Sequence, residues 1–311
     1  MTISTVDHAH IENRDLIKLP VTPEIKARFA AQGFLALERI TSDADIAFIR
    51  DTLERLFADR SGYEEGAFFD FAGAGDEDGI FKLPQLLDPR SFAPALVETE
   101  FFRNGLAVAK ELLGKDTTFA ADHALVKPAM TGGLTPWHQD EAFHDPELHR
   151  DAISIWMPLQ AVDQVNGCMS FIPGSHLGEV LPHRSMNGDD RIHALECAGS
   201  FDVAEAVHCP MPAGGCTIHT SRTLHGAGPN KSERPRFAYV LVFHCPTKPA
   251  GSPKDHPWLV GKTTPRMNRR RAWMRHGGFL VHGWRRMKQI KHIGVRETYF
   301  RIVGKLRKAL R

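Results

Sequence analysis

Two histidines and an aspartate, split between two distant segments, are the residues of this chain best suited to metal chemistry. His138-Gln139-Asp140 places an imidazole and a carboxylate two residues apart, and His225 follows much later. Two imidazoles and one carboxylate form the facial triad that holds a ferrous ion on one side and leaves the other coordination positions open. The sequence therefore predicts an iron site made of His138, Asp140 and His225.

Arg236, eleven residues beyond His225, supplies a partner for that site. It begins the apolar run 237–243, which predicts a buried strand, and a guanidinium at the root of such a strand needs an anion. The far carboxylate of 2-oxoglutarate fits the guanidinium fork, so the four residues predict an Fe(II)- and 2-oxoglutarate-dependent oxygenase. An internal ion pair is the alternative role for Arg236. Arg234, before Pro235, is the second candidate anchor, and we expect it to be more exposed.

Strand geometry explains how such ligands are positioned. Side chains alternate along a strand, so His138 and Asp140 are expected to project to the same side of one strand. The third ligand must then come from a second strand. Glycines beside His225 let the backbone pass close to a filled site. His219 is the only rival for the third ligand.

The surrounding pattern predicts helices packed on a β core. We expect helices over 22–32, 43–58 and 92–113, the last with Ser91 as N-cap and a break at Asn104-Gly105. Phe34–Leu37 reads as a short strand and 61–79 as a loop. From Lys115 the runs are short and bounded by turn residues, which predicts a β sandwich or barrel over 116–247. Asn166-Gly167 predicts a hairpin turn.

Composition is that of a globular protein in a reducing compartment. The chain has 311 residues, of which 42% are hydrophobic and 24% charged, so it can bury a full core. The start lacks the pattern of a signal peptide, and no apolar run is long enough to span a membrane. The five cysteines are odd in number and form no C-x-x-C pair, so we expect reduced thiols and a cytoplasmic protein.

A net charge of +2 hides a strong asymmetry. Fifteen Lys or Arg and one acid, Glu297, lie in 266–311, so this segment is strongly basic and the rest is acidic. We divide the chain into an oxygenase domain over 1–247, a linker or lid over 248–265 and a basic, helical extension over 266–311. The extension is suited to an anionic membrane surface or an acidic carrier protein, or simply packs on the acidic body.

Four blocks of sequence, in order, resemble the phytanoyl-CoA dioxygenase family. They are Pro136-Trp137-His138-Gln139-Asp140-Glu141, Trp156, Asn166-Gly167-Cys168-Met169-Ser170-Phe171-Ile172-Pro173-Gly174-Ser175-His176, and His225-Gly226-Ala227-Gly228-Pro229-Asn230-Lys231-Ser232 running to Arg236. The resemblance covers about 28–246. It implies a mainly β fold, the double-stranded β-helix (jelly roll, cupin-like), flanked by N-terminal helices. It also implies Fe(II) as cofactor, with 2-oxoglutarate and O2 as co-substrates.

The resemblance carries over to individual residues. His138, Asp140 and His225 match the iron ligands, and Arg236 matches the 2-oxoglutarate anchor. Lys82 and Trp156 stand where the family often lines the co-substrate pocket. The family often has a serine two residues beyond the distal histidine, whereas Ala227 stands here.

The carboxylate ligand discriminates between reaction outcomes. Halogenating relatives lack it, so the presence of Asp140 predicts hydroxylation, with release of succinate and CO2, of a small-molecule or lipid-like substrate. Two other functions remain open: a non-catalytic metal-binding barrel, and a nucleic-acid demethylase of the same iron class, although we expect no nucleic-acid partner. His123 and Lys127 are expected near the pocket mouth, His144 on a loop, and His176 in a turn.

Overall fold

The computed structural model describes residues 21–75, 81–131, 133–252 and 255–284. Its helices are α1 (Pro23–Gln32), α2 (Asp43–Ala58), α3 (Glu100–Leu113) and α4 (Pro265–Trp273). The larger sheet has the strand order β1 (Phe34–Leu37), β12 (Cys216–Thr220), β7 (Ala152–Pro158), β14 (Arg236–His244), β4 (Thr118–Lys127), β3 (Pro84–Leu87) and β2 (Phe68–Asp70). The smaller sheet has the order β11 (Val207–Cys209), β8 (Met169–Phe171), β13 (His225–Ala227) and β5 (Thr135–His138).

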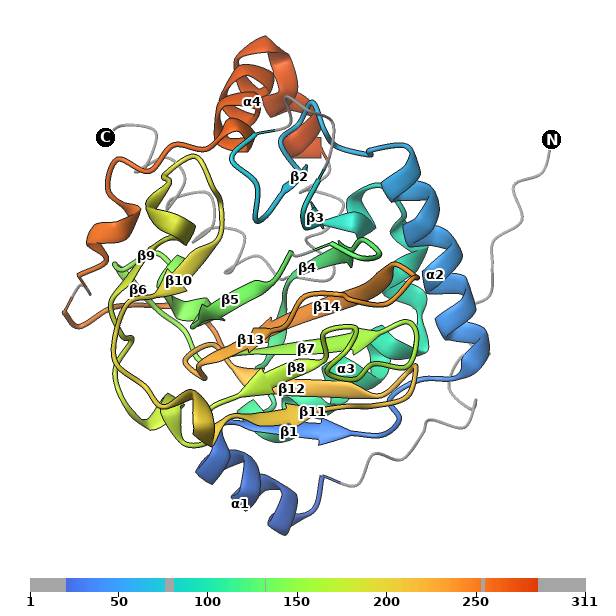
Figure 1. Cartoon of the computed structure of the whole chain (residues 1–311), viewed down its shortest axis with the longest axis vertical. Coiled ribbons are helices and arrows are strands. Elements are labelled where there is room, and N and C mark those ends of the chain that lie inside the picture. Colours follow the sequence, from blue (N-terminus) through green and yellow to red (C-terminus); the bar gives the residue numbers. More distant parts are fainter. Residues whose placement is uncertain (1–20, 76–80, 132, 253–254, 285–311) are drawn as a thin grey trace.

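The two sheets face each other, as expected for the double-stranded β-helix (Figure 1). All paired strands of both sheets are antiparallel, and consecutive strands often belong to different sheets. Side chains from both sheets line one cavity between them. Two short strand pairs lie beside this core: β9 (His183–Ser185) with β10 (Leu195–Cys197), and β6 (Leu148–His149) with β15 (Lys248–Pro249).

Helix capping follows the sequence signals at the N-terminal end. Thr22 caps α1 with its side chain, Pro23 occupies the first turn, and Gly33 ends the helix in the left-handed conformation that glycine adopts at low cost. Ser42 caps α2 by accepting a hydrogen bond from the Asp45 amide. The predicted helices 22–32 and 43–58 and the strand Phe34–Leu37 are therefore confirmed.

Strand β14 divides its side chains between two environments. Its odd-numbered residues Phe237, Tyr239, Leu241 and Phe243 join the apolar core that includes residues of α2 and α3. Its even-numbered residues Arg236, Val240, Val242 and His244 line the cavity. This is the period-two alternation of a strand buried on both faces. The same strand thus contributes to stability on one side and to the cavity on the other.

The predicted helix over 92–113 is confirmed for 100–113, but its expected start and its expected break at Asn104-Gly105 were wrong. A 3-10 helix at Pro94–Glu98 precedes α3, and the break falls at Thr99, whose side chain caps α3. Asn104 lies buried within α3 and donates to the Ile40 carbonyl over 2.8 Å. A Cβ on Gly105 would lie 3.3 Å from a Leu241 methyl. The pair therefore allows close packing of α3 on the sheet instead of ending the helix.

Two further sequence expectations need correction. The segment 61–79, expected as a loop, contains β2, and its residues 76–79 lie outside the described part. Asn166-Gly167 forms a turn, with Gly167 at a φ of 86°, but this turn joins β7 to β8, which belong to different sheets. Turn chemistry specifies a reversal of the chain and does not specify which strands pair.

The segment after β14 returns to the β core. The 3-10 helix η8 (Pro257–Leu259) places the Trp258 indole so that it donates to the Ala142 carbonyl over 2.9 Å. Lys262 donates to the Ser185 hydroxyl and the Ile192 carbonyl. Arg266, at the start of α4, donates to the Gly66 carbonyl. The stretch 248–265, expected as a linker or lid, is thus fastened to the core at several points.

Helix α4 confirms helical structure at the start of the basic segment 266–311. The rest of the extension, 285–311, lies outside the described residues. Among the residues that the structure describes, no helix is long and apolar enough to cross a bilayer.

A buried ionic network joins β4 and β14 to the loop after β3. Asp122, 1% exposed, accepts hydrogen bonds from the Arg90 amide, the Arg90 Nε and the Tyr239 hydroxyl. Removal of one partner leaves another buried polar group without compensation. Asp122→Asn is expected to lower the free energy of unfolding by about 3 kcal/mol, and Tyr239→Phe by about 2 kcal/mol.

Urea unfolding of the two variants, beside the exposed control Asp116→Asn, measures these losses. A control loss as large as that of Asp122→Asn, or an unchanged Asp122→Asn protein, would contradict the structural role of the network.

Candidate active site

Two paired strands bring two of the three expected ligands together. His138 is the last residue of β5 and His225 the first residue of β13, and the two face each other in the antiparallel register. Their ring centroids are 4.2 Å apart. Residues directly opposite in such a pair carry side chains on the same face. Pairing of β5 with β13 therefore joins two imidazoles that are far apart in the sequence.

Asp140 does not lie on the strand that carries His138, contrary to expectation. It is the first residue of a 3-10 helix, η4 (Asp140–Phe143). Gln139 between them has an extended backbone, with φ −115° and ψ 129°, so strand-like alternation continues for one more residue. Asp140 therefore still projects to the side of His138, and its Oδ1 lies 3.5 Å from the His138 Nε2 and 3.7 Å from the His225 Nε2.

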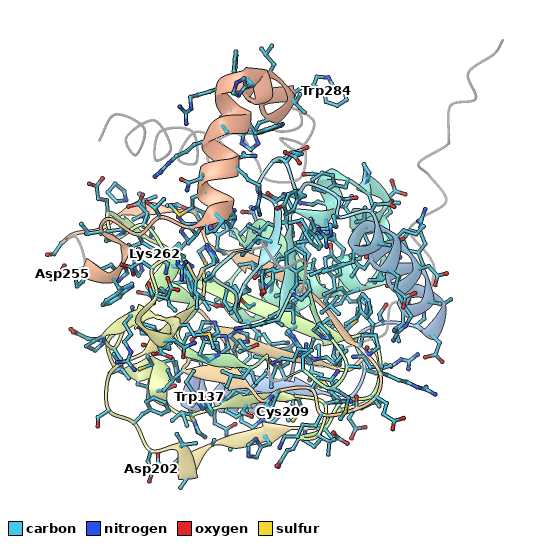
Figure 2. The ribbon with its side chains drawn as sticks, turned by 45° about the horizontal axis from the view of Figure 1, so that its top comes forward. Trp137, Asp202, Cys209, Asp255, Lys262 and Trp284 are labelled. Carbon is cyan, nitrogen blue, oxygen red and sulfur yellow. The ribbon has the colours of Figure 1, made fainter. Side chains whose placement is uncertain are left out.

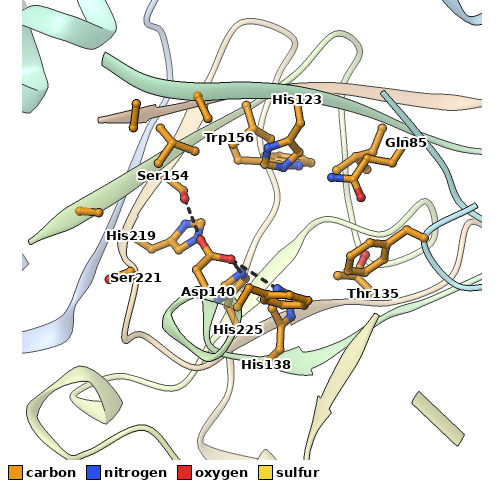
Figure 3. A pocket seen from close by; sticks show the side chains of 18 of the residues that line it. Gln85, His123, Thr135, His138, Asp140, Ser154, Trp156, His219, Ser221 and His225 are labelled. Carbon is orange, nitrogen blue, oxygen red and sulfur yellow. Dashed lines mark hydrogen bonds and ion pairs between the residues drawn. The ribbon is translucent and has the colours of Figure 1, made fainter. Parts of the chain in front are cut away.

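Hydrogen bonds orient all three side chains. The Nδ1 of His138 donates to the Pro136 carbonyl over 2.8 Å, and the Nδ1 of His225 donates to the Thr223 carbonyl over 2.9 Å. These contacts leave each Nε2 lone pair facing Asp140, whose Oδ2 accepts from the Ser154 hydroxyl over 2.7 Å (Figure 3). Such partners commonly fix the tautomer and direction of metal ligands.

The protonation states suit metal binding. Burial lowers the pKa of His225 well below its ordinary value, so its imidazole is neutral at neutral pH. Burial alone raises the pKa of Asp140, but the His225, His138 and His219 side chains hold it well below its usual range. Two imidazoles and a carboxylate, with ligand atoms all within 4.8 Å of one another, fit a ferrous ion bound on one face.

A cavity of about 390 Å³ extends from these ligands. Its opposite wall carries Gln85, His123 and Trp156 (Figure 3). Strand β14 contributes its even-numbered residues, and β7 contributes Ala152, Ser154 and Trp156. The volume is near the lower end of the range for small-molecule sites. The ligand set therefore faces a partly open cavity that suits small molecules.

Arg236 carries the clearest unmet hydrogen-bonding capacity in this cavity. It is 1% exposed, and its Nε and Nη1 are buried without a hydrogen-bond partner. Its guanidinium lies 5.3 Å from the centre of the Trp156 ring. Burial lowers the pKa of Arg236 to about 9, so the group remains cationic at neutral pH. A buried cation with free donors is suited to a bound carboxylate. The rival anchor Arg234 is exposed, as expected.

Trp156 and Lys82, the other two residues expected to line the co-substrate pocket, lie in different places. Trp156 lines the cavity beside Arg236. Lys82 is exposed and absent from the cavity wall, so the expectation that it lines the co-substrate pocket was wrong. Its amide is tied to the Asp70 carboxylate over 2.7 Å, and the inward positions on this segment belong to Leu83 and Gln85. Ala227, where the family often has serine, ends β13 as a buried residue.

The remaining histidines and Lys127 separate into cavity and framework residues. His123, His144 and His219 line the cavity, and the His219 Nε2 lies 3.4 Å from the Asp140 Oδ2. His176 instead contacts the Ala30 carbonyl near α1. Lys127 is fully buried and donates to the carbonyls of Gly133, Ala227 and Gly228, so it braces the backbone and does not lie at the pocket mouth.

Several cavity residues were not found from the sequence. Arg150, His193 and His244 line the cavity. His244 had a usable signal, because it shares the even positions of β14 with Arg236. The structural role of Gln139 was also missed. Its backbone amide donates to the His183 Nε2 over 3.1 Å, and its side-chain amide contacts the backbone of Arg222 and Leu181. No local pattern in the sequence marks these contacts.

Comparisons with known proteins agree on one family. The model of the family described as phytanoyl-CoA dioxygenase (PhyH) matches residues 29–238. A probable alpha-ketoglutarate-dependent hypophosphite dioxygenase of Stutzerimonas stutzeri is 26% identical, over 78% of this chain and 88% of its own. L-proline trans-4-hydroxylase of Streptomyces griseoviridis is also 26% identical, over 78% and 94%. The crystal structure of EvdO2 from Micromonospora carbonacea var. aurantiaca with 2-oxoglutarate has a TM-score of 0.66 and 33% identity, over 83% and 98%.

The ligand set predicts how metal affinity responds to substitution. His225→Ala removes one of three donors and is expected to abolish tight binding of Fe(II) or Mn(II). Ser154→Ala frees the Asp140 carboxylate and is expected to weaken binding by about 10- to 100-fold. Anaerobic calorimetric titration measures both, with His176→Ala as the control histidine outside the cavity. Retained binding in His225→Ala together with loss in His219→Ala would transfer the third-ligand role to His219.

Proposed function

The chain belongs to the phytanoyl-CoA dioxygenase family and is an Fe(II)- and 2-oxoglutarate-dependent dioxygenase, and on that basis we propose roles for its individual residues. His138, Asp140 and His225 bind the ferrous ion. Arg236 binds the far carboxylate of 2-oxoglutarate, and Trp156 forms the wall beside that carboxylate. O2 is the second co-substrate.

One observation carries this assignment: the unpartnered donors of Arg236 open into the same cavity as the convergent ligand atoms. A buried guanidinium without a protein anion is costly. A dicarboxylate that spans from the metal to Arg236 satisfies both ends at once. 2-Oxoglutarate is such a dicarboxylate.

The chain's own residues bind, orient and shield the reactants. The backbone hydrogen bonds of His138 and His225 occupy each Nδ1 and leave each Nε2 directed at the metal position. Burial lowers the pKa of His225, so its binding to the metal needs no loss of a proton. Ser154 keeps the Asp140 carboxylate turned toward the metal position. The apolar wall of Leu83, Val240 and Val242 excludes water. The bound metal, together with 2-oxoglutarate and O2, supplies the oxidising chemistry.

The reaction proposed is hydroxylation of a carbon atom, with release of succinate and CO2. Asp140 occupies the carboxylate position, so no coordination site is left for a halide. The relatives named for hypophosphite and L-proline act on small molecules. A cavity of about 390 Å³ that also receives 2-oxoglutarate suits a small substrate or the reactive end of a lipid-like one.

Arg236 distinguishes this proposal from the non-catalytic barrel and from other metal chemistry. Arg236→Ala is expected to raise the 2-oxoglutarate concentration needed for half-saturation roughly 100-fold, because a charge-assisted contact worth about 3 kcal/mol is lost. Arg236→Lys is expected to recover part of it, since a lysine keeps the charge but not the fork. Anaerobic titration of the visible absorption of the Fe(II)–2-oxoglutarate complex measures this.

Arg234→Ala is the matched control, because Arg234 is exposed two residues away. Equal effects of Arg234→Ala and Arg236→Ala would contradict the assignment. A wild-type protein that binds Fe(II) but never forms the coloured complex would support the non-catalytic barrel. Salt-sensitive nucleic-acid binding lost on deletion of 266–311 would support the demethylase.

We further propose that the basic extension 266–311 docks a cytoplasmic enzyme peripherally on an anionic membrane surface. Helix α4 and the residues after it carry exposed Arg271 and Arg275 beside exposed Phe279, Leu280 and Trp284. Trp284 lies at the outer end of this segment, away from the β core (Figure 2). Basic and aromatic side chains together suit the headgroup region of anionic lipid. The five cysteines are free, which supports the proposed cytoplasmic location.

Vesicle sedimentation tests the docking. Full-length protein is expected to sediment with phosphatidylserine-containing vesicles, less so in high salt, and not with phosphatidylcholine alone. Leu280→Ser with Trp284→Ser is expected to reduce binding several-fold, at about 1 to 3 kcal/mol per buried apolar side chain. Leu177→Ser is the control, because Leu177 is 72% exposed elsewhere. Binding to an acidic carrier protein but to no vesicle would favour the carrier instead.

A further inference from the structure

Arg150 is a second, half-buried cation in the cavity, and the proposed chemistry does not use it. It lies between β6 and β7 and lines the cavity. Its Nε is buried without a hydrogen-bond partner, and no carboxylate of the described residues forms a salt bridge with it. A guanidinium nitrogen left in this state calls for an anion, as it does for Arg236. The cavity therefore has two cationic positions and one assigned anion.

Strand register separates these two positions. Arg236 begins β14 and His244 ends it, and the Arg236 guanidinium lies 5.3 Å from the centre of the Trp156 ring on β7. His244 pairs with Ala152, two residues beyond Arg150, and the Asp151 carbonyl accepts from the Cys245 amide over 2.9 Å. Arg150 is thus fixed at the end of the cavity opposite to Arg236.

The metal ligands lie between these two ends, because Ser154 stands between Trp156 and Ala152 on β7. Ser154, which donates to Asp140, pairs with Val242, and His244 is only two residues further, about 7 Å along the strand. Ala120, Ala121 and Ala152 line the cavity with small side chains. A ligand held by Arg150 would therefore bring a carbon a few bonds from its anionic group to the metal position.

The groups around Arg150 indicate which anion fits. Burial, with a contribution from Arg150, lowers the pKa of His144 to about 4, so His144 is neutral at neutral pH and can donate one hydrogen bond. Arg150 then supplies one positive charge and a planar fork. A carboxylate matches that charge and shape, whereas a phosphate dianion would leave buried negative charge uncompensated.

We propose that Arg150, with His144 and His244 beside it, binds the carboxylate of a small substrate at the end of the cavity opposite to 2-oxoglutarate. This inference rests on the proposed function of the site, because it assumes that Arg236 is already paired with the co-substrate. It makes the substrate a small carboxylic acid that is oxidised close to its acid group.

Binding of matched acids and amides tests the charge requirement. Hexanoate, cyclohexanecarboxylate and benzoate are titrated by anaerobic calorimetry into protein saturated with Fe(II) and 2-oxoglutarate, beside their three neutral carboxamides. The best acid is expected to bind at least 10-fold more tightly than its amide, which corresponds to one charge-assisted contact. Equal binding of acids and amides, or binding of neither, overturns the proposal.

Variants assign the preference to Arg150. Arg150→Gln is expected to remove the preference for acids, and Arg150→Lys to restore part of it, while the affinity for 2-oxoglutarate stays within about 2-fold of wild type. His193→Gln, another cavity residue, is the control and keeps the preference. A loss of 2-oxoglutarate affinity in Arg150→Gln as large as in Arg236→Ala would make Arg150 part of the co-substrate site and overturn the inference.

The visible absorption of the Fe(II)–2-oxoglutarate complex keeps the two proposals distinguishable. It must persist while the acid binds, because an acid that displaces 2-oxoglutarate from Arg236 would abolish it. Loss of absorption on addition of acid overturns the assignment of the acid to Arg150. Absence of the absorption in wild-type protein, before any acid is added, would instead overturn the proposed function.

Discussion

The antiparallel pairing of β5 with β13 is the constraint on which the site depends. It sets His138 opposite His225, and the backbone carbonyls of Pro136 and Thr223 then turn each ring so that the Nε2 atoms converge. A slip of one residue would turn one imidazole to the other face of the sheet and destroy the convergence. The larger sheet, the helices behind it and the turn between β7 and β8 all serve to hold this register.

The sequence predicted most of the chemistry because its signals are local. The prediction that His138 and Asp140 share one side needs only the alternation of side chains in an extended segment. The prediction that Arg236 is buried needs only the apolar strand that follows it. Caps at Thr22 and Ser42 likewise act within one turn. What could not be predicted depends on tertiary contacts. The Ser221 carbonyl accepts from the Glu141 amide and Trp258 donates to the Ala142 carbonyl, so two distant segments hold the turn of η4 that begins at Asp140. Gly105 does not end α3, because it packs closely against Leu241 and Phe243 of β14.

The alternation of side chains along β14 separates its residues into those that pack in the core and those that line the cavity. The odd residues, such as Tyr239, belong to the helix-covered core, where changes in volume cost stability. The even residues face the cavity, where Val242 and His244 shape the space around a ligand. Substitutions on the cavity face can therefore alter specificity without disturbing the packing that holds the sheet to α3. This separation gives a physical reason why one fold serves many substrates.

The hydrogen bond from Trp258 to the Ala142 carbonyl affects the order in which the site is completed during synthesis. During synthesis η4, which bears Asp140, emerges long before its brace, and β5 emerges long before β13. Pairing across such sequence separations is slow, because the entropy cost of closing a long loop comes before the contacts that stabilise the pair. The nascent chain therefore carries an unfinished site until β13 and then η8 have left the ribosome. Metal captured before β13 emerges would meet only two of the three donors, so loading with metal is expected to follow the pairing of β13 with β5.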